Sequence, residues 1–94
     1  MKLVWAPEAL QDRMDIWDFI ATDNPAAAAR MDDLFSDSAT RLAEHPKLDR
    51  PGKIVGTREL VVHKHYRLVY EISDDTVYLL TLIHTARLWP PAKT

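Results

Sequence analysis

The spacing of apolar residues changes halfway along this chain of 94 residues, and that change limits the folds it can adopt. In the first half, up to about residue 46, apolar side chains recur every three or four positions, which is the spacing of one helix face. From Arg58 onward they follow a period of two in runs rich in Val, Leu, Ile and Tyr, which is typical of strands. The pattern therefore predicts helices followed by a sheet.

Two helices are predicted in the first half. Pro7 suits a first helical position, where its missing N–H costs nothing, and Asn24 followed by Pro25 supplies an N-cap and a second such position. The second helix should end near His45, because a residue before proline disfavours helical geometry. The stripe of the first helix contains Leu10, Met14, Trp17, Ile20 and Ala21, and that of the second Ala27, Met31, Leu34, Phe35, Ser38 and Leu42. Joined by a short link, the two helices should form an antiparallel hairpin.

Four strands are predicted around this hairpin. A short β-prone segment, Lys2 to Trp5, precedes it. After a loop from Lys47 to Gly56 come Arg58 to His63, Tyr66 to Ile72 and Thr76 to His84, separated by the two-residue turns Lys64-His65 and Asp74-Asp75. The prediction is a single α+β domain spanning residues 1–94. It has an antiparallel sheet of about four strands with the helical hairpin packed on one face, in the order β-α-α-β-β-β.

Two-residue turns also predict the register, and the register decides which side chains share a face. The expected pairs are Val62 with Arg67, Arg58 with Glu71, Leu82 with Arg67 and His84 with His65. The face toward the helices would then hold Val61, Leu68, Tyr70, Ile72, Val77, Leu79 and Ile83. The opposite face would gather Arg58, Arg67, Glu71 and His84 among Leu60, Val62, Val69, Leu80 and Leu82. An apolar surface with convergent cations suggests a covering partner protein.

Each polar residue of that face also has a purely structural interpretation. Arg58 opposite Glu71 can be a simple cross-strand ion pair. Arg67 has no carboxylate directly opposite it in the expected register, and a cation among valines and leucines is costly unless it is exposed, paired or used. His84 is either a capped strand end or a proton carrier, because histidine titrates near neutral pH. His63 and His65 flank a turn, where solvated side chains are expected.

Composition excludes several classes of protein. Without cysteine there is no disulfide, thiolate nucleophile or thiolate metal site, which agrees with a cytoplasmic location. No apolar run approaches the roughly 20 residues of a membrane span, and we expect neither secretion nor insertion. Residues 1–46 carry 4 Lys or Arg against 9 Asp or Glu, and residues 47–94 carry 8 against 5, so the sheet half is only mildly basic.

Metal and cofactor chemistry finds no support in the motifs. His63-Lys64-His65 supplies two possible ligands, whereas zinc needs three or four. The sequence has no Gly-rich phosphate loop and no Gly-x-Ser-x-Gly motif. We therefore expect no metal and no cofactor.

Three segments together resemble the RelE/ParE toxin superfamily of type II toxin–antitoxin systems. They are Gly56-Thr-Arg-Glu-Leu-Val-Val-His63, Tyr66-Arg-Leu-Val-Tyr70 and His84-Thr-Ala-Arg-Leu-Trp-Pro90. The resemblance covers nearly the whole chain and is closest to the ParE-like, plasmid-stabilisation branch. It implies a growth-inhibiting toxin that a cognate antitoxin neutralises.

The resemblance leaves two activities open. ParE-like members poison DNA gyrase, whereas RelE-like members cleave mRNA on the ribosome. For a ribonuclease, Arg58, Arg67 and Arg87 would stabilise the phosphate and His84 would move a proton, although the C-terminal tyrosine of that branch is absent. If the protein is not an enzyme, the same residues form a target-binding face. An inactive homologue that only binds antitoxin is a further alternative. Operator DNA would be bound only through the antitoxin.

Overall fold

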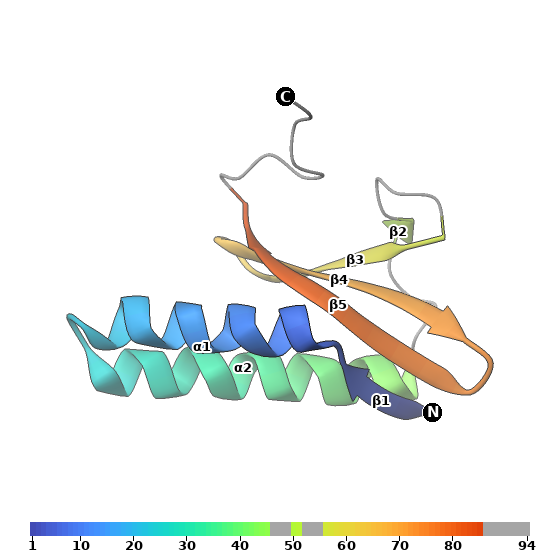
Figure 1. Ribbon diagram of the computed structural model, residues 1–94, viewed down its shortest axis with the longest axis horizontal. Helices are drawn as coiled ribbons and strands as arrows, with labels where there is room; N and C mark the ends of the chain where they lie inside the picture. The colour runs from blue at the N-terminus through green and yellow to red at the C-terminus, as the bar shows by residue number, and fades with distance from the viewer. Residues whose placement is uncertain (46–49, 52–55, 86–94) are drawn as a thin grey trace.

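The elements follow one another as the sequence predicts, in a computed structural model that describes residues 1–45, 50–51 and 56–85 (Figure 1). They are β1 (Lys2–Trp5), α1 (Pro7–Ala21), α2 (Pro25–Glu44), β2 (Arg50–Pro51), β3 (Arg58–His63), β4 (Tyr66–Ser73) and β5 (Thr76–His84). The two-residue strand β2 lies within the predicted loop, whose residues 47–49 and 52–55 lie outside the described residues.

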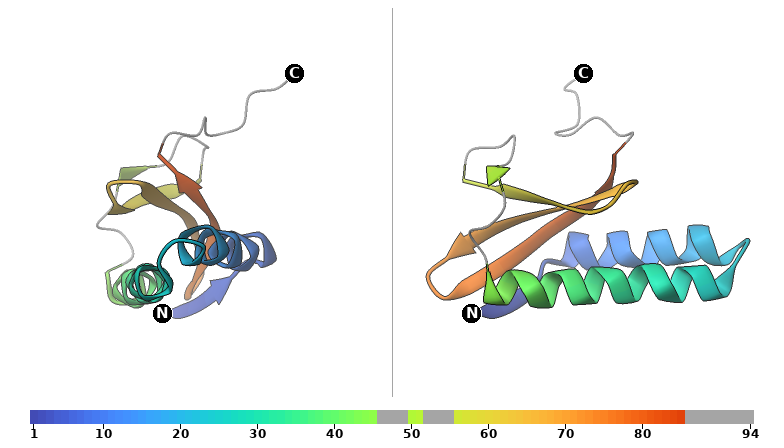
Figure 2. Two further views of the ribbon diagram at one scale, coloured as in Figure 1. Left: turned by 90° about the vertical axis from the view of Figure 1, so that its left-hand side faces the viewer. Right: turned by 180° about the vertical axis from the view of Figure 1, so that it is seen from behind.

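The sheet has the strand order β1-β5-β4-β3-β2, with α1 and α2 side by side beneath it (Figures 1 and 2). The β3–β4–β5 meander is antiparallel as predicted, but β1 runs parallel to β5, with Leu3 opposite Val77. The predicted all-antiparallel sheet is thus a mixed sheet with an additional short edge strand. The four residues of β1 contain no sequence pattern that would distinguish parallel from antiparallel pairing. The helical hairpin, β3 and β4 between β1 and β5 supply the long connection that parallel pairing requires.

Local signals fix the ends of both helices. Pro7 and Pro25 stand in the first turns of α1 and α2, and Asn24 Oδ1 accepts a hydrogen bond from the Ala27 N–H at 3.1 Å. Such an N-cap contributes about 1 kcal/mol. Thr22 follows α1, and its hydroxyl donates to the Asp18 carbonyl at 2.9 Å. The predicted helix boundaries are confirmed because proline and capping residues act within one turn.

The predicted turns are confirmed but the predicted register is wrong. Both turns contain two residues, since His63 pairs with Tyr66 and Ser73 with Thr76. Irregularities then shift the ladders, one between Val61 and His63 and one near Val69. The structure therefore pairs Arg58 with Tyr70, Arg67 with Val61 and Ile83, and His84 with Tyr66. One extra residue in a ladder moves the following side chains to the other face, and no composition signal marks these positions.

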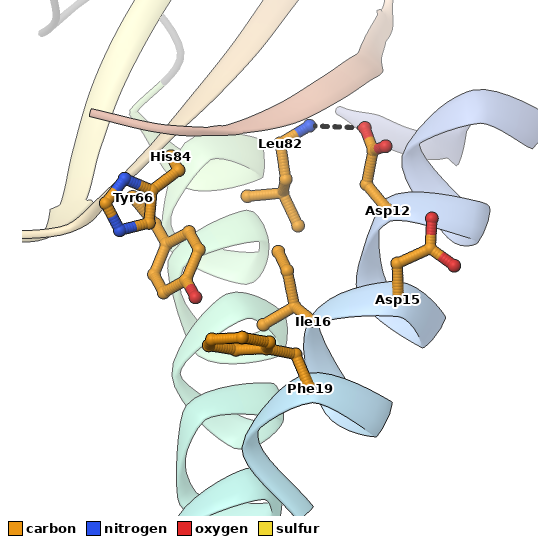
Figure 3. Close-up of a pocket in the computed structure, with 7 residues that line it drawn as sticks. All are labelled: Asp12, Asp15, Ile16, Phe19, Tyr66, Leu82 and His84. Carbon is orange, nitrogen blue, oxygen red and sulfur yellow. Dashed lines mark hydrogen bonds between the residues drawn. The ribbon is translucent and has the colours of Figure 1, made fainter. Parts of the chain in front are cut away.

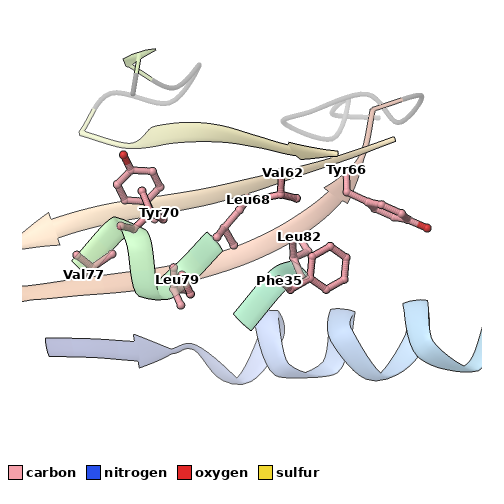
Figure 4. Close-up of a cluster of buried hydrophobic side chains, with 10 residues drawn as sticks. Phe35, Val62, Tyr66, Leu68, Tyr70, Val77, Leu79 and Leu82 are labelled. Atoms are coloured by element: carbon pink, nitrogen blue, oxygen red, sulfur yellow. The ribbon is translucent and has the colours of Figure 1, made fainter. Parts of the chain in front are cut away.

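The core lies between the sheet and α2, with Phe35 beneath the strands (Figure 4). Leu68, Tyr70, Ile72, Val77 and Leu79 face the helices as predicted, joined by Val62, Tyr66 and Leu82. The prediction is wrong for Val61, which is 49% exposed, and for Ile83, which is buried opposite Arg67 on the other face. Burial of each large apolar side chain stabilises the fold by about 1.5–3 kcal/mol.

The predicted stripe of α1 is the other large difference. Leu10, Met14 and Trp17 are 47%, 60% and 39% exposed, while Ala9 is buried and Ile16 packs against the core. Apolar residues occur on two sides of α1, so periodicity alone does not choose the inner one. The stripe of α2 is confirmed, with Phe35, Ser38 and Leu42 buried.

Candidate functional site

Arg67 lies on the sheet face away from the helices, where it is paired. Its Nη1 donates to Glu59 Oε1 at 3.1 Å, and the two side chains are 14% and 5% exposed. The Nε of Arg67 is buried without a hydrogen-bond partner. The expected register placed no carboxylate opposite Arg67, because it did not bring Glu59 close. The Arg67 guanidinium is thus paired with a carboxylate of the neighbouring strand β3.

His84 lies on the other face, the one toward the helices. It stands opposite Tyr66, and the two rings meet edge to face with their centroids 5.3 Å apart. The His84 ring also stacks on His65 at 5.5 Å. His84 therefore belongs to an aromatic cluster at the β3–β4 turn and is separated from Arg67 by the sheet.

Arg58 also faces the helix side, because it pairs with Tyr70, while Glu71 pairs with Tyr78. The predicted opposition of Arg58 and Glu71 is wrong. Tyr70 and Tyr66 are four residues apart along β4, which places Arg58 roughly 13 Å from the level of His84. Arg87 lies outside the described residues. The predicted gathering of Arg58, Arg67 and His84 on one face is therefore not observed.

The β3–β4 turn brings three histidines together. His63 and His65 have ring centroids 5.4 Å apart, and the His65 N–H donates to His63 Nδ1 at 3.2 Å. Partial loss of hydration lowers the pKa of His65, and electrostatic interaction with Lys64, His63 and His84 lowers it further. Within the described ranges, no group of three or more residues is arranged to hold a metal ion.

A hollow of about 510 Å³ opens between α1 and the last part of β5 (Figure 3). Tyr66 and His84 form one wall, and Ile16, Phe19, Asp12 and Asp15 of α1 form the other, with Leu82 between them. Phe19 is 76% exposed. The sequence alone did not indicate this site. Phe19 lies outside the α1 stripe, and only the tertiary fold brings α1 to the Tyr66–His84 pair.

Asp12 joins α1 to the part of the β5 edge that β1 leaves unpaired. Its Oδ2 accepts hydrogen bonds from the Thr81 hydroxyl at 2.6 Å and the Leu82 N–H at 2.9 Å. β1 pairs with β5 only as far as Leu79, so this carboxylate satisfies a backbone donor that the strand ladder leaves unpaired. The wall of the hollow is held in place by these bonds.

The exposed stripe of α1 borders a second hollow of about 480 Å³, lined by Leu10, Arg13, Met14, Trp17, Asp18 and Asp32. Arg13 joins the two helices here through bonds of 2.9 and 2.8 Å to the two carboxylate oxygens of Asp32. Its guanidinium carbon also lies 4.5 Å from the ring centroid of Trp5. The stripe is thus an apolar surface on a helix that Arg13 ties to α2 and β1. No helix in the described ranges is long and apolar enough to span a membrane.

Solved structures of other proteins share this fold. A chromosomal ParDE system from P. aeruginosa matches with a TM-score of 0.78 and 18% identity over 89% of this chain and 95% of that one. A YoeB–YefM toxin–antitoxin complex from Staphylococcus aureus matches with a TM-score of 0.59 and 15% identity over 86% and 92% of the two chains. At these identities the likeness shows the fold.

Sequence comparison identifies the family. The model for the ParE toxin of type II toxin–antitoxin systems matches residues 3–89. A putative toxin, Y4kP, of Sinorhizobium fredii is 39% identical over 95% of this chain and 93% of its own length. Toxin RelE2 of Caulobacter vibrioides is 37% identical over 93% and 98%. The chain belongs to the ParE toxin family and is the toxin of a type II toxin–antitoxin module.

Proposed function

We propose that this toxin arrests growth by binding a protein target, with DNA gyrase favoured, rather than by cleaving RNA. The observation that carries the proposal is the separation of Arg67 from His84 by the sheet. Phosphodiester cleavage needs a proton-transfer group and a cation at the same phosphate, within hydrogen-bond reach of the reacting atoms. Arg67 donates to the Glu59 carboxylate and does not face the same side of the sheet as His84.

Ribosome-dependent mRNA cleavage is the alternative. The His84–Tyr66 pair at the mouth of a hollow places a possible proton carrier beside a phenol, which favours it. The carboxylates of Asp12 and Asp15 across that hollow would oppose a phosphate. The matching family is named for ParE and one relative is named RelE2, so the names support neither target over the other.

The partner that we propose is an antitoxin whose tail lies along the helical hairpin. The two proteins would meet in the cytoplasm, and operator DNA would be bound only through the antitoxin. Leu10, Met14 and Trp17 provide an apolar strip at spacings of four and three, which suits an amphipathic helix. Methionine adapts its shape to different partners. Solved structures with the same fold include toxin–antitoxin complexes.

Two assays on the purified toxin separate the targets. Gyrase-dependent supercoiling should fall with toxin concentration, while mRNA on translating ribosomes should stay intact. Cleavage of the mRNA that is lost in His84→Ala, with supercoiling unaffected, would overturn the gyrase proposal. Expression in a bacterium should arrest growth, and co-expression of antitoxin should restore it. Antitoxin binding without growth arrest would instead identify an inactive homologue.

A further inference from the structure

The hollow beside Phe19 has the chemistry of a socket for a cationic side chain. Its lining combines the rings of Phe19, Tyr66 and His84 with Asp12 and Asp15 of α1 (Figure 3). Among the described residues, neither lysine nor arginine lines it. A site that contains both acidic groups and aromatic rings can attract a cation in two ways, through the carboxylate charge and through the electron-rich ring faces.

The carboxylates have acceptor capacity to spare. Asp12 uses Oδ2 for both of its bonds to β5, and Asp15 Oδ1 accepts from Gln11 Nε2 at 2.9 Å. In the described part of the chain, Asp12 Oδ1 and Asp15 Oδ2 accept no hydrogen bond. Asp15 is exposed, so an incoming donor reaches it without displacing a core contact.

Phe19 is the strongest indication that a ligand covers this place. It is the most exposed of the large apolar side chains in the described residues, at 76%, and it stands at the rim of the hollow rather than in the Leu10–Met14–Trp17 strip. Arginine fits such a rim better than lysine, because its planar guanidinium can stack on a ring while its N–H groups fork toward a carboxylate.

We propose that an arginine of the antitoxin inserts into this hollow, stacking on Phe19 and donating to Asp15. The inference rests on the proposed neutralisation by an antitoxin and adds a second contact, separate from the apolar strip. Its role is to fix the register of the antitoxin segment on the toxin, because a single charged anchor at one point forbids shifted docking.

The test measures the dissociation constant between the full-length toxin and the antitoxin encoded by the neighbouring gene. Asp15→Asn should weaken binding about tenfold, in the range for a charged hydrogen bond. Phe19→Leu keeps an apolar residue but removes the ring, and should weaken binding about three- to tenfold. Asp37→Asn is the matched control, since Asp37 is exposed on α2 and lines neither hollow.

The antitoxin side completes the test. One antitoxin Arg→Ala substitution should couple to Asp15→Asn, so that the pair of changes costs little more than either one. Raising the salt concentration should reduce the difference in dissociation constant between wild type and Asp15→Asn. Wild-type affinity in both Asp15→Asn and Phe19→Leu, or additive effects with every antitoxin arginine, would overturn the socket but leave antitoxin binding intact. Failure of the wild-type toxin to bind the antitoxin would overturn both proposals.

Discussion

Arg67 and Glu59 form an ion pair across β3 and β4 on the face away from the helices, with Nη1 and Oε1 3.1 Å apart. The pair explains how a cation can sit in mid-strand beside buried apolar residues such as Val69. It also ties down a residue that a ribonuclease would need for phosphate. We therefore interpret Arg67 first as part of the sheet's structure.

Breaking this pair from one side should destabilise the toxin. Arg67→Met leaves the buried Glu59 carboxylate without the Arg67 guanidinium, and the free energy of unfolding should fall by about 3 kcal/mol. Arg67→Met with Glu59→Leu removes both charges and should recover most of that loss. Urea denaturation followed by circular dichroism measures both values. Equal stability of the single and double variants would contradict a buried pair. Loss of toxicity in a stable double variant would show that Arg67 takes part in binding the target.

Asp12 should contribute more to the free energy of unfolding than the exposed Asp15. Asp12→Ala removes the acceptor of the Thr81 hydroxyl and the Leu82 N–H, and should cost about 1–3 kcal/mol. Asp15→Asn changes an exposed carboxylate and should stay within about 0.5 kcal/mol of wild type. Thermal unfolding of the two variants at the same pH makes the comparison. A melting temperature of Asp12→Ala equal to that of wild type would show that water replaces the carboxylate at the β5 edge.

Met14 should matter for the partner and not for the fold. Because Met14 is 60% exposed, Met14→Glu should leave the free energy of unfolding within about 0.5 kcal/mol of wild type. A carboxylate in the middle of the apolar strip should weaken antitoxin binding at least about tenfold, since a buried unpaired charge costs several kcal/mol. Isothermal titration calorimetry gives the affinity. Ser73→Glu is the control, because Ser73 is exposed at the end of β4 and should bind normally. Wild-type antitoxin affinity in Met14→Glu would show that the Leu10–Met14–Trp17 strip is not the antitoxin-binding surface.

The histidine cluster should make the toxin less stable in mild acid. The native pKa of His65 lies below its ordinary value of 6.5, so the unfolded chain binds this proton more readily than the native state. The contribution of neutral His65 to the free energy of unfolding is fully present above about pH 6.5. It is lost as the pH falls through the lowered native pKa. His65→Gln should flatten that part of the stability curve, measured by denaturation at several pH values. Lys64→Gln should move the pKa of His65 back toward 6.5 in an NMR titration. An unchanged pKa would mean that Lys64 exerts no effect through its charge.

Local chemistry in the sequence determined the helices, the turns and the α+β class. Pro7, Asn24 and Pro25 act on the backbone within one helical turn, and the period of two marks three strands whatever they pack against. The family was also visible in the sequence, because its motifs are contiguous in the chain. These features depend on neighbours along the chain.

Only the tertiary structure decided the faces. Two irregular positions in the strand ladders moved His84 toward the helices and left Arg67 opposite Ile83, and packing turned Leu10, Met14 and Trp17 outward. The socket beside Phe19 combines residues that are distant in sequence but adjacent in space. The position of a bulge and the side of a helix that packs inward depend on how well the helices fit the whole sheet. That fit is a sum over long-range contacts, which no single segment encodes.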